Sequence, residues 1–381
     1  MADNNLESLF SKLRRFPDVE STNLQAWDAT DKLLLDTAAG LLGPGSTLAV
    51  VGDRYGALTL GALTLAAGSG RTVRVHQDLV TGERALRNNA EALGISGGFE
   101  QLPLGPALAG ASVVLLQLPK SLAELEEIAD AVARHAAPGV VLLAGGRVKH
   151  MSLGMNTVLE RYFTEVRPQL ARQKSRILLA SGPKPLTGAP PFPVTGNNAE
   201  LGLVVCAHGA VFAGTGLDIG TRFLLDFLPR MPHARHAIDL GCGTGILAAM
   251  YARSHPDAGV TATDQSAAAV GSALATARAN GLEGQIDVLQ DDAMGSLAQG
   301  SAGLVLLNPP FHLGAAVHAG AGIKMIEAAG RVLAPGGELW TVFNSHLHYQ
   351  PALERLIGPT REVGRNPKFT VTASTRKTAR A

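Results

Sequence analysis

The sequence predicts an α/β protein of two tandem domains, each built around a doubly wound parallel sheet, with the first domain a degenerate copy of the second. Three observations predict this class. Short apolar runs alternate with helical patterns in both halves of the chain. A proline-rich stretch separates the halves, and four segments of the first half match four of the second in the same order. Such alternation is typical of parallel sheets covered by helices.

In the second half, the apolar runs have the length and the branched side chains of buried strands. They span residues 236–240, 259–264, 286–290, 303–308 and 337–343. Amphipathic stretches at 266–281 and 315–334 lie between them and have the periodicity of helices. We therefore expect each strand to be followed by a helix that packs on the sheet.

The first half repeats this order. Aligning the two halves sets Gly52 opposite Gly241, Asp78 near Asp264, and the run SVVLLQLPKS opposite GLVLLNPPFH. Four such matches in order, with similar spacing, indicate an internal duplication. The copies differ chemically, because Arg54 replaces the middle glycine of the loop and Gln-Leu-Pro-Lys replaces Asn-Pro-Pro-Phe. We expect the first copy to keep the fold without the site.

The boundaries follow from a proline-rich stretch, in which five prolines fall between positions 183 and 193. Prolines at this density without apolar periodicity indicate a linker. The expected organisation is a degenerate domain at 1–185, a linker at 186–200 and a catalytic domain at 201–381.

Composition excludes several classes of protein. The chain of 381 residues is 46% hydrophobic with a net charge of +1, its N-terminus is charged, and no apolar run is long enough to span a bilayer. Cys206 and Cys242 lack the spacing of zinc ligands or of a disulfide framework. We expect a cytoplasmic protein without a metal ion, most simply a monomer.

Local clusters supply the positive charge that the whole chain lacks. Between positions 145 and 185, eight bases face two acids, and three of the bases are Arg172, Lys174 and Arg176. The C-terminal tail is also basic, and there Lys368 adjoins Phe369, whose ring could stack on a nucleobase. Each cluster fits a solvated surface as well as a nucleic-acid contact, so both are supporting observations.

A glycine-rich loop follows the first strand of the second copy. Asp239 is followed by Gly241, Gly243 and Gly245 where the strand ends and a helix begins. Glycines there allow a tight turn and let backbone N–H groups approach a ligand. Asp264 ends the next strand, where its carboxylate could accept both hydrogen bonds of a ribose diol or, alternatively, cap the next helix.

A third acidic residue, Asp292, follows the third strand. It could accept a hydrogen bond from the amino group of an adenine, while the Ala293 N–H donates to the ring. Asp291 lies beside it, and either carboxylate could be a solvated loop residue.

The tetrapeptide Asn308-Pro309-Pro310-Phe311 follows the fourth strand and indicates the chemistry. An exocyclic amine on a purine is a poor nucleophile, because its lone pair is delocalised into the ring. If the Asn308 side-chain oxygen and the Pro309 carbonyl both accept from that NH2, its lone pair is turned toward an electrophile. Pro310 would stiffen the loop, and Phe311 offers a face for an extruded base. A plain turn explains the prolines but needs no aromatic residue.

These motifs resemble those of class I methyltransferases, which use S-adenosyl-L-methionine. NPPFH is similar to the variant of the ribosomal RNA guanine-N2 methyltransferases, and residues 14–35, 216–229 and 344–358 resemble the bacterial large-subunit enzymes. The resemblance implies methyl transfer to N2 of a guanine in 23S rRNA, with an RNA-binding first copy and a second copy that binds the cofactor and the flipped guanine. One departure is Ala213-Gly214, where the family has a small polar and a basic residue.

Other assignments stay open. The acceptor could be a guanine of 16S rRNA, since small-subunit enzymes share the later motifs. Enzymes that methylate a glutamine amide in a translation factor resemble the chain around Asn-Pro-Pro, but they carry Tyr after the prolines and a small helical N-terminal domain. A nucleotide-binding oxidoreductase fits the combined motifs poorly, and a non-catalytic RNA-binding scaffold would not need the intact tetrapeptide.

Overall fold

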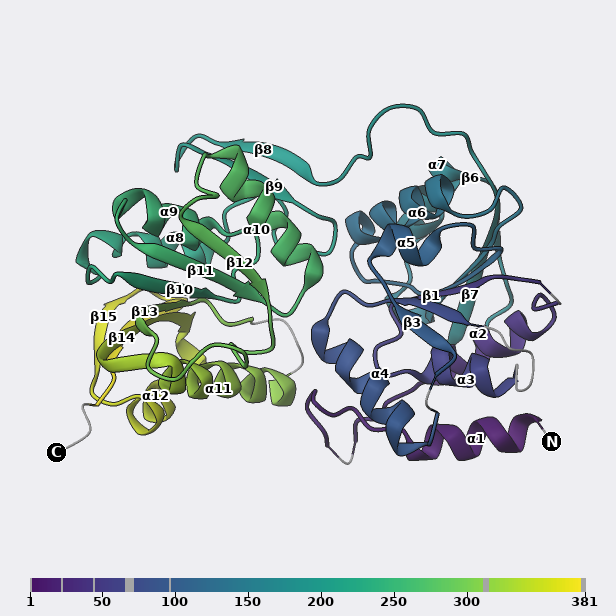
Figure 1. Ribbon diagram of the computed structural model, residues 1–381, viewed down its shortest axis with the longest axis horizontal. Helices are drawn as coiled ribbons and strands as arrows, with labels where there is room; N and C mark the ends of the chain where they lie inside the picture. The colour runs from purple at the N-terminus through teal and green to yellow at the C-terminus, as the bar shows by residue number, and fades with distance from the viewer. Residues whose placement is uncertain are drawn as a thin grey trace. The chain divides into compact units, whose positions relative to one another are not determined.

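The computed structural model describes residues 2–21, 23–43, 45–65, 72–95, 97–310 and 315–377 (Figure 1). The chain divides into two compact units, Met1–Phe192 and Pro193–Ala381. We call them unit 1 and unit 2, and each contains one seven-stranded sheet.

Unit 1 opens with two helices, after which strands and helices alternate. Its elements are α1 (Ala2–Lys12), α2 (Ala29–Ala39), β1 (Leu48–Val51), α3 (Ala57–Leu65), β2 (Val73–His76), α4 (Val80–Ala92), β3 (Phe99–Gln101), α5 (Leu104–Leu108), β4 (Val113–Gln117), α6 (Leu122–His135), β5 (Val141–Arg147), η1 (Val148–His150), α7 (Leu153–Tyr162), β6 (Phe163–Pro168) and β7 (Ser175–Pro183).

Unit 2 opens with a hairpin and then follows the same order. Its elements are β8 (Val194–Asn198), β9 (Leu203–Ala207), α8 (Ile219–Leu225), η2 (Leu228–Arg230), β10 (His236–Leu240), α9 (Ile246–Ser254), β11 (Gly259–Asp264), α10 (Ala267–Ala279), β12 (Ile286–Gln290), β13 (Ala302–Leu307), α11 (Ala315–Val332), β14 (Leu333–Asn344), η3 (Ser345–Leu347), α12 (Gln350–Leu356), β15 (Thr360–Arg365) and β16 (Phe369–Thr375).

The two large sheets have one topology, which confirms the predicted fold class and duplication. Their strand orders are β3-β2-β1-β4-β5-β7-β6 and β12-β11-β10-β13-β14-β16-β15. The expectation of parallel strands holds for the first five strands of each copy. It is wrong for the last two, because β6 and β7 form a hairpin that inserts β7 antiparallel to β5, and β15 and β16 do the same beside β14.

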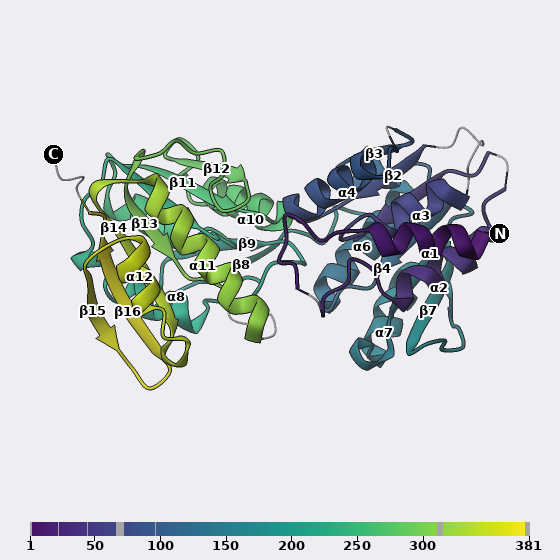
Figure 2. The same cartoon turned by 90° about the horizontal axis from the view of Figure 1, so that it is seen from below.

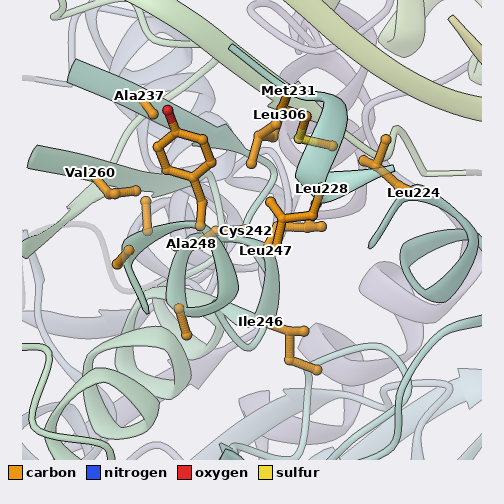
Figure 3. Packing of buried hydrophobic residues seen from close by; sticks show 14 of the residues in the cluster. Leu224, Leu228, Met231, Ala237, Cys242, Ile246, Leu247, Ala248, Val260 and Leu306 are labelled. Carbon is orange, nitrogen blue, oxygen red and sulfur yellow. The ribbon is translucent and has the colours of Figure 1, made fainter. Parts of the chain in front are cut away.

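Helices cover both faces of each sheet (Figures 1 and 2). Because side chains alternate along a strand, neighbouring residues of β10 join different cores: Ala237 packs in one cluster and Ile238 in another. Figure 3 shows the first of these, in which Leu247 of α9 lies over the sheet with Val260 and Leu306. Burial on both faces explains the nearly continuous apolar runs of the sequence.

The strand register positions the candidate site. Leu240 pairs with Thr263 of β11 on one side and with Leu307 of β13 on the other. The next residue of each strand or loop is therefore Gly241, Asp264 or Asn308, and all three leave the sheet at the same edge. In doubly wound folds this carboxyl edge is where ligands bind.

The expected linker is shorter in the structure, because residues beyond 193 form β8 and pair with β9. The outer edge of β9 is covered by α10 side chains spaced one turn apart. The Asn280 side chain and the Thr276 hydroxyl each accept from a backbone N–H of β9 at 3.0 Å, and the Ser272 hydroxyl accepts from the N–H of His208, the residue after β9, at 2.9 Å. These hydrogen bonds attach the β8–β9 hairpin to α10, and so to the rest of unit 2.

None of the helices within the described ranges is both long and apolar enough to cross a bilayer.

Candidate functional site

The glycine loop joins β10 to α9 with a backbone that favours glycine. Gly241, Gly243 and Gly245 have φ values of +75°, +53° and +76°, in the left-handed region where other residues are strained. A Cβ at Gly245 would also lie 3.0 Å from the Ala273 Cβ of α10. The first two glycines thus shape the turn, and the third allows α9 and α10 to pack closely.

Asp264 lies against this loop. Its carboxylate accepts from the Gly243 N–H at 3.1 Å and from the Ser266 N–H at 3.0 Å. The cap of α10 is Ser266 itself, whose hydroxyl accepts from the Ala269 N–H at 3.1 Å. Asp264 is therefore not needed as the helix cap, and its partly exposed carboxylate adjoins the turn.

Asp239 is buried beneath the loop. Its Oδ2 accepts from the Ala248 N–H of α9 at 2.9 Å, whereas its Oδ1 has no hydrogen-bond partner among the described residues. Burial, reinforced by the charge of Asp264, raises the pKa of the Asp239 carboxyl to about 7. A buried acceptor without a partner is costly unless a ligand satisfies it, so Asp239 fits a group that carries N–H donors or positive charge.

The structure separates the two acidic candidates after β12. Asp291 is 3% exposed and accepts from the Ser296 N–H and hydroxyl, both at 2.7 Å, so it shapes the loop. Asp292 instead accepts from the Lys324 Nζ of α11 at 2.6 and 2.7 Å. The exposed lysine must share Asp292 or move aside before this carboxylate can bind an amino group.

Asn308 follows β13 with its side chain anchored at one end. The Asn308 Nδ2 donates to Asp218 Oδ2 and to Thr221 Oγ1, each at 2.9 Å. Its Oδ1 is buried and has no partner within the described part of the chain. Pro309 is buried and Pro310 is exposed, while Phe311 lies outside the described residues. The amide thus presents an acceptor at the carboxyl edge of the sheet.

Sequence reasoning missed the anchoring residues. Asp218 caps α8 and accepts from the Thr221 N–H at 3.0 Å, and both residues contact Asn308 across about 90 positions of sequence. The segment 216–229 contributed to the family resemblance without a role for its side chains. The local signal was Asp218 before a helical run, a pattern that predicts a cap and cannot predict its distant partner.

In unit 1, the corresponding edge has different chemistry. Gly52 and Gly56 keep positive φ values of +78° and +94°. The register pairs Val51 with His76, so the counterpart of Asp264 is Gln77 and the alignment with Asp78 is off by one residue. The degenerate copy has therefore lost the carboxylate as well as the middle glycine.

Charged side chains also gather at this edge of unit 1, where Glu124 and Asp78 are half-buried and Arg54 is exposed. Burial raises the pKa of the Glu124 carboxyl to about 7, the charge of Asp78 raises it further, and Arg54 opposes both. The Gln117 side chain, which replaces Asn308, donates to Asp31. Arg54, in the place of a glycine, thus belongs to a charged group that unit 2 does not have.

The predicted RNA-binding bases of unit 1 lie on and beside the β6–β7 hairpin. Arg172 and Lys174 are exposed at its tip, and Arg176 is half-buried on β7 with an unpartnered Nε. Within the described residues these three form no ion pair, whereas Arg161 pairs with Glu126 at 2.6 Å and Arg167 with Glu165 at 2.8 Å. Arg172, Lys174 and Arg176 therefore form, among the described residues, a set of bases without ion pairs at one hairpin.

Lys368 is exposed between β15 and β16, with its Nζ 5.3 Å from the centroid of the Phe369 ring. The expectation that Phe369 is available to stack on a base is wrong. It is 4% exposed and packs in the core of unit 2, because the alternation of β16 turns it inward.

Both cysteines, Cys206 and Cys242, are free and buried, and burial raises the pKa of the Cys242 thiol well above its usual range. Among the residues that the structure describes, no group of three or more His, Cys, Asp or Glu side chains is arranged to hold a metal ion.

A doubly wound sheet with a glycine loop after its first strand, an acidic residue after its second and Asn-Pro-Pro after its fourth defines a Rossmann-like methyltransferase unit. Models of known families agree: the methyltransferase small domain matches residues 202–373, and the RLMG N-terminal domain matches residues 1–184. The chain belongs to the ribosomal RNA large subunit methyltransferase G family.

Individual relatives support this assignment over nearly the whole chain. The ribosomal RNA large subunit methyltransferase G of Streptomyces coelicolor is 38% identical over 94% of this chain and 96% of its own length. That of Pseudomonas aeruginosa is 37% identical with the same coverage. The solved Thermus thermophilus 16S rRNA N2 G1207 methyltransferase (RsmC), in complex with AdoMet and guanosine, superposes with a TM-score of 0.72 at 21% identity and covers 92% of both chains, which shows the fold.

We predict that Asp239→Asn stabilises unit 2 more at pH 8 than at pH 5. The pKa of Asp239 is about 7 in the folded state and near 3.8 when unfolded, so the folded protein holds the proton more tightly. Wild-type stability therefore falls as pH rises from about 4 to about 7, whereas the asparagine variant has no such term. The difference in free energy of unfolding should grow by at least about 1 kcal/mol across this range.

Urea denaturation in a Trp27→Phe background would measure it, because Trp340 is then the single tryptophan and reports on unit 2. Asp287→Asn, at an exposed position of β12, is the control. A difference between Asp239→Asn and wild type that does not change with pH would contradict the prediction.

Proposed function

We propose that the chain transfers a methyl group from S-adenosyl-L-methionine to the exocyclic N2 of a guanine in 23S rRNA. The observation that carries the proposal is the Asn308 side chain at the carboxyl edge of the sheet. Its nitrogen is anchored, and its oxygen has no partner among the residues that the structure describes. The names of the relatives favour the large subunit. The solved RsmC structure, which has the same fold at 21% identity, is a complex with AdoMet and guanosine.

The edge of unit 2 suits this cofactor. The glycine loop brings backbone N–H groups to the ligand edge, the carboxylate of Asp264 can accept from a ribose diol, and Asp292 can accept from an adenine amino group. Asp239 Oδ1, which has no partner among the described residues, could accept a hydrogen bond from the ammonium group of the methionine end. When bound, S-adenosyl-L-methionine supplies an electrophilic methyl group on a sulfonium.

The protein acts mainly on the acceptor amine. Asn308 Oδ1 and the Pro309 carbonyl accept from the guanine NH2, which draws the nitrogen toward tetrahedral geometry and directs its lone pair at the methyl carbon. The N–C bond forms as the C–S bond breaks, and the methylated nitrogen then loses a proton to water. Phe311 provides a face on which the flipped base can stack.

Unit 1 contributes RNA affinity in this proposal and none of the chemistry. The exposed bases at its hairpin can contact phosphates, while the edge that corresponds to the cofactor site carries Arg54 and lacks the carboxylate of Asp264. A ribosomal RNA substrate implies a cytoplasmic location. Unit 1 then serves as the RNA-binding domain and unit 2 as the catalytic domain.

We predict one cofactor site per chain, located in unit 2. Asp264→Ala should weaken S-adenosyl-L-methionine binding by at least about 10-fold, because it removes a charged acceptor of two hydrogen bonds. Asp78→Ala in unit 1, which removes the acidic residue next to Gln77, is the control and should leave the affinity unchanged. Calorimetry that finds two sites, or a loss of binding with Asp78→Ala, would refute this assignment.

Asn308→Ala should lower kcat by about 100-fold or more while cofactor affinity stays within about two-fold, because Asn308 acts on the amine in the transition state. In cells lacking the gene, wild-type protein should restore N2-methylguanosine to 23S rRNA and the variant should not. Mass spectrometry of rRNA nucleosides, with the site mapped, measures this. Normal methylation by the variant, or a missing methyl group that maps to 16S rRNA, would count against the proposal.

The exposed bases at the β6–β7 hairpin should contribute to RNA binding by unit 1. Neutralising Arg172, Lys174 and Arg176 together should weaken binding to 23S rRNA. It should also make the plot of log K against log salt less steep by about 2 to 3, because fewer phosphate contacts form and fewer counterions are released on binding. Cofactor affinity should not change. Filter binding over a series of salt concentrations gives both quantities.

A matched control removes three other bases from the same region. Arg161 and Arg167 pair with acids, and Lys184 donates to the Glu160 carbonyl, so their replacement by glutamine should change the salt slope much less. Equal losses from the two triple variants would mean that net charge, and not the hairpin surface, determines RNA affinity.

A further inference from the structure

We infer that Asp218 and Thr221 are positioning residues, which fix the orientation of the Asn308 amide so that its oxygen faces the methyl acceptor. This inference rests on the proposed function, because that function gives Asn308 its role. The first turn of α8, which is far from the tetrapeptide in the sequence, would then have a functional role.

The hydrogen bonds around the amide determine its orientation. A half-turn about the last torsion of an asparagine exchanges its oxygen and its NH2 group at almost no steric cost, so only the surrounding partners decide between the two. Asn308 Nδ2 donates to Asp218 Oδ2 and to Thr221 Oγ1, each at 2.9 Å. Asp218 Oδ2 also accepts from the Thr221 N–H at 3.0 Å, as the cap of α8.

A turned amide would lose this arrangement. It would place Asn308 Oδ1 against the Asp218 carboxylate, and two acceptors repel. In the observed orientation both amide protons are used, and the buried oxygen is left without a partner among the described residues. The anchoring groups thus determine that the oxygen, and not the NH2 group, is the unsatisfied end of the side chain.

Close approach of the helix supports the same assignment. Gly220 lies between the two anchoring residues, and a Cβ there would come within 3.0 Å of Asp218 Oδ2 and 3.3 Å of Asn308 Oδ1. Position 220 therefore has little room for a side chain while the amide keeps its place. The first turn of α8 packs directly on Asn308.

The duplicated unit shows that this contact belongs to the shared framework. In unit 1, α2 is capped by Asp28, which accepts from the Thr30 N–H at 2.6 Å. The amide at the end of the fourth strand, β4, is Gln117, and it donates to Asp31 in the first turn of the same helix. Unit 2 thus keeps a contact present in both copies and combines it with the Asn-Pro-Pro motif. The N-cap Asp28 of unit 1 therefore offers a control position in the copy that lacks the Asn-Pro-Pro motif.

Without its anchor, the amide can present NH2 to the NH2 of the acceptor. Two donors then face one another, and the lone pair of the guanine nitrogen is no longer directed toward the methyl carbon. Because this defect concerns orientation within the bound complex, it should appear in kcat. The affinities for RNA and cofactor depend on other residues and should change little.

Asp218→Ser tests the inference in the full-length protein. Serine keeps an N-cap acceptor for α8 but is too short to hold the amide as the carboxylate does. We expect kcat with 23S rRNA to fall about 10- to 100-fold, as for a displaced reacting group, with KM for RNA and cofactor affinity within about two-fold of wild type. Thr221→Val, which loses one acceptor, should lower kcat by about five-fold. Asp28→Ser should leave all three quantities unchanged.

Exchange of the Asn308 side-chain protons gives a readout independent of activity. Their NMR signal, identified by its absence in Asn308→Ala, should be protected in wild type and exchange at least about 10-fold faster in Asp218→Ser, because the anchoring bond is gone. Wild-type kcat in Asp218→Ser, or unchanged exchange, would overturn the inference. A wild-type protein that does not methylate guanine N2 would instead refute the proposed function, while the exchange measurement still tests the anchor.

Discussion

The parallel pairing of β10 with β11 and β13 is the constraint on which the candidate site depends. It aligns Leu240, Thr263 and Leu307 across three strands, so the residues that follow them emerge together at one edge. There the chain must turn into helices on either face, and the turns are free to carry polar groups that a buried strand cannot. Gly241, Asp264 and Asn308 meet for this reason, although the first and last are far apart in sequence.

The two copies share this strand pairing but differ in the residues at the carboxyl edge of the sheet. Both copies retain the seven-strand order and left-handed glycines at the two ends of the loop. In unit 1, Arg54 takes the place of the middle glycine, and Gln77 the place of the acidic residue. The sheet topology therefore survives without the ligand site, because core packing and strand pairing do not use the residues at the edge.

Much of this followed from the sequence, because strand periodicity and glycine turns are local signals. The antiparallel β7 and β16 were missed, since an apolar run does not encode strand direction. The hairpin strand β8 was missed because Val194–Asn198 is polar and partly exposed. The inward position of Phe369 depends on register within β16. The contact of Asp218 with Asn308 spans 90 residues, and only the assembled fold brings the two together.

Several buried polar atoms near the edge of unit 2 lack partners among the described residues, and Asp239 Oδ1 and Asn308 Oδ1 are two of them. Each is the free end of a side chain whose other end is fixed, Asp239 by the Ala248 N–H and Asn308 by α8. Leaving such atoms unsatisfied destabilises the folded protein by about 1–3 kcal/mol each. The cost makes sense if binding removes it, since a cationic cofactor and a donor NH2 supply the missing partners. In the proposed site this cost would be preorganisation, because the two acceptors would be in place before the ligands bind.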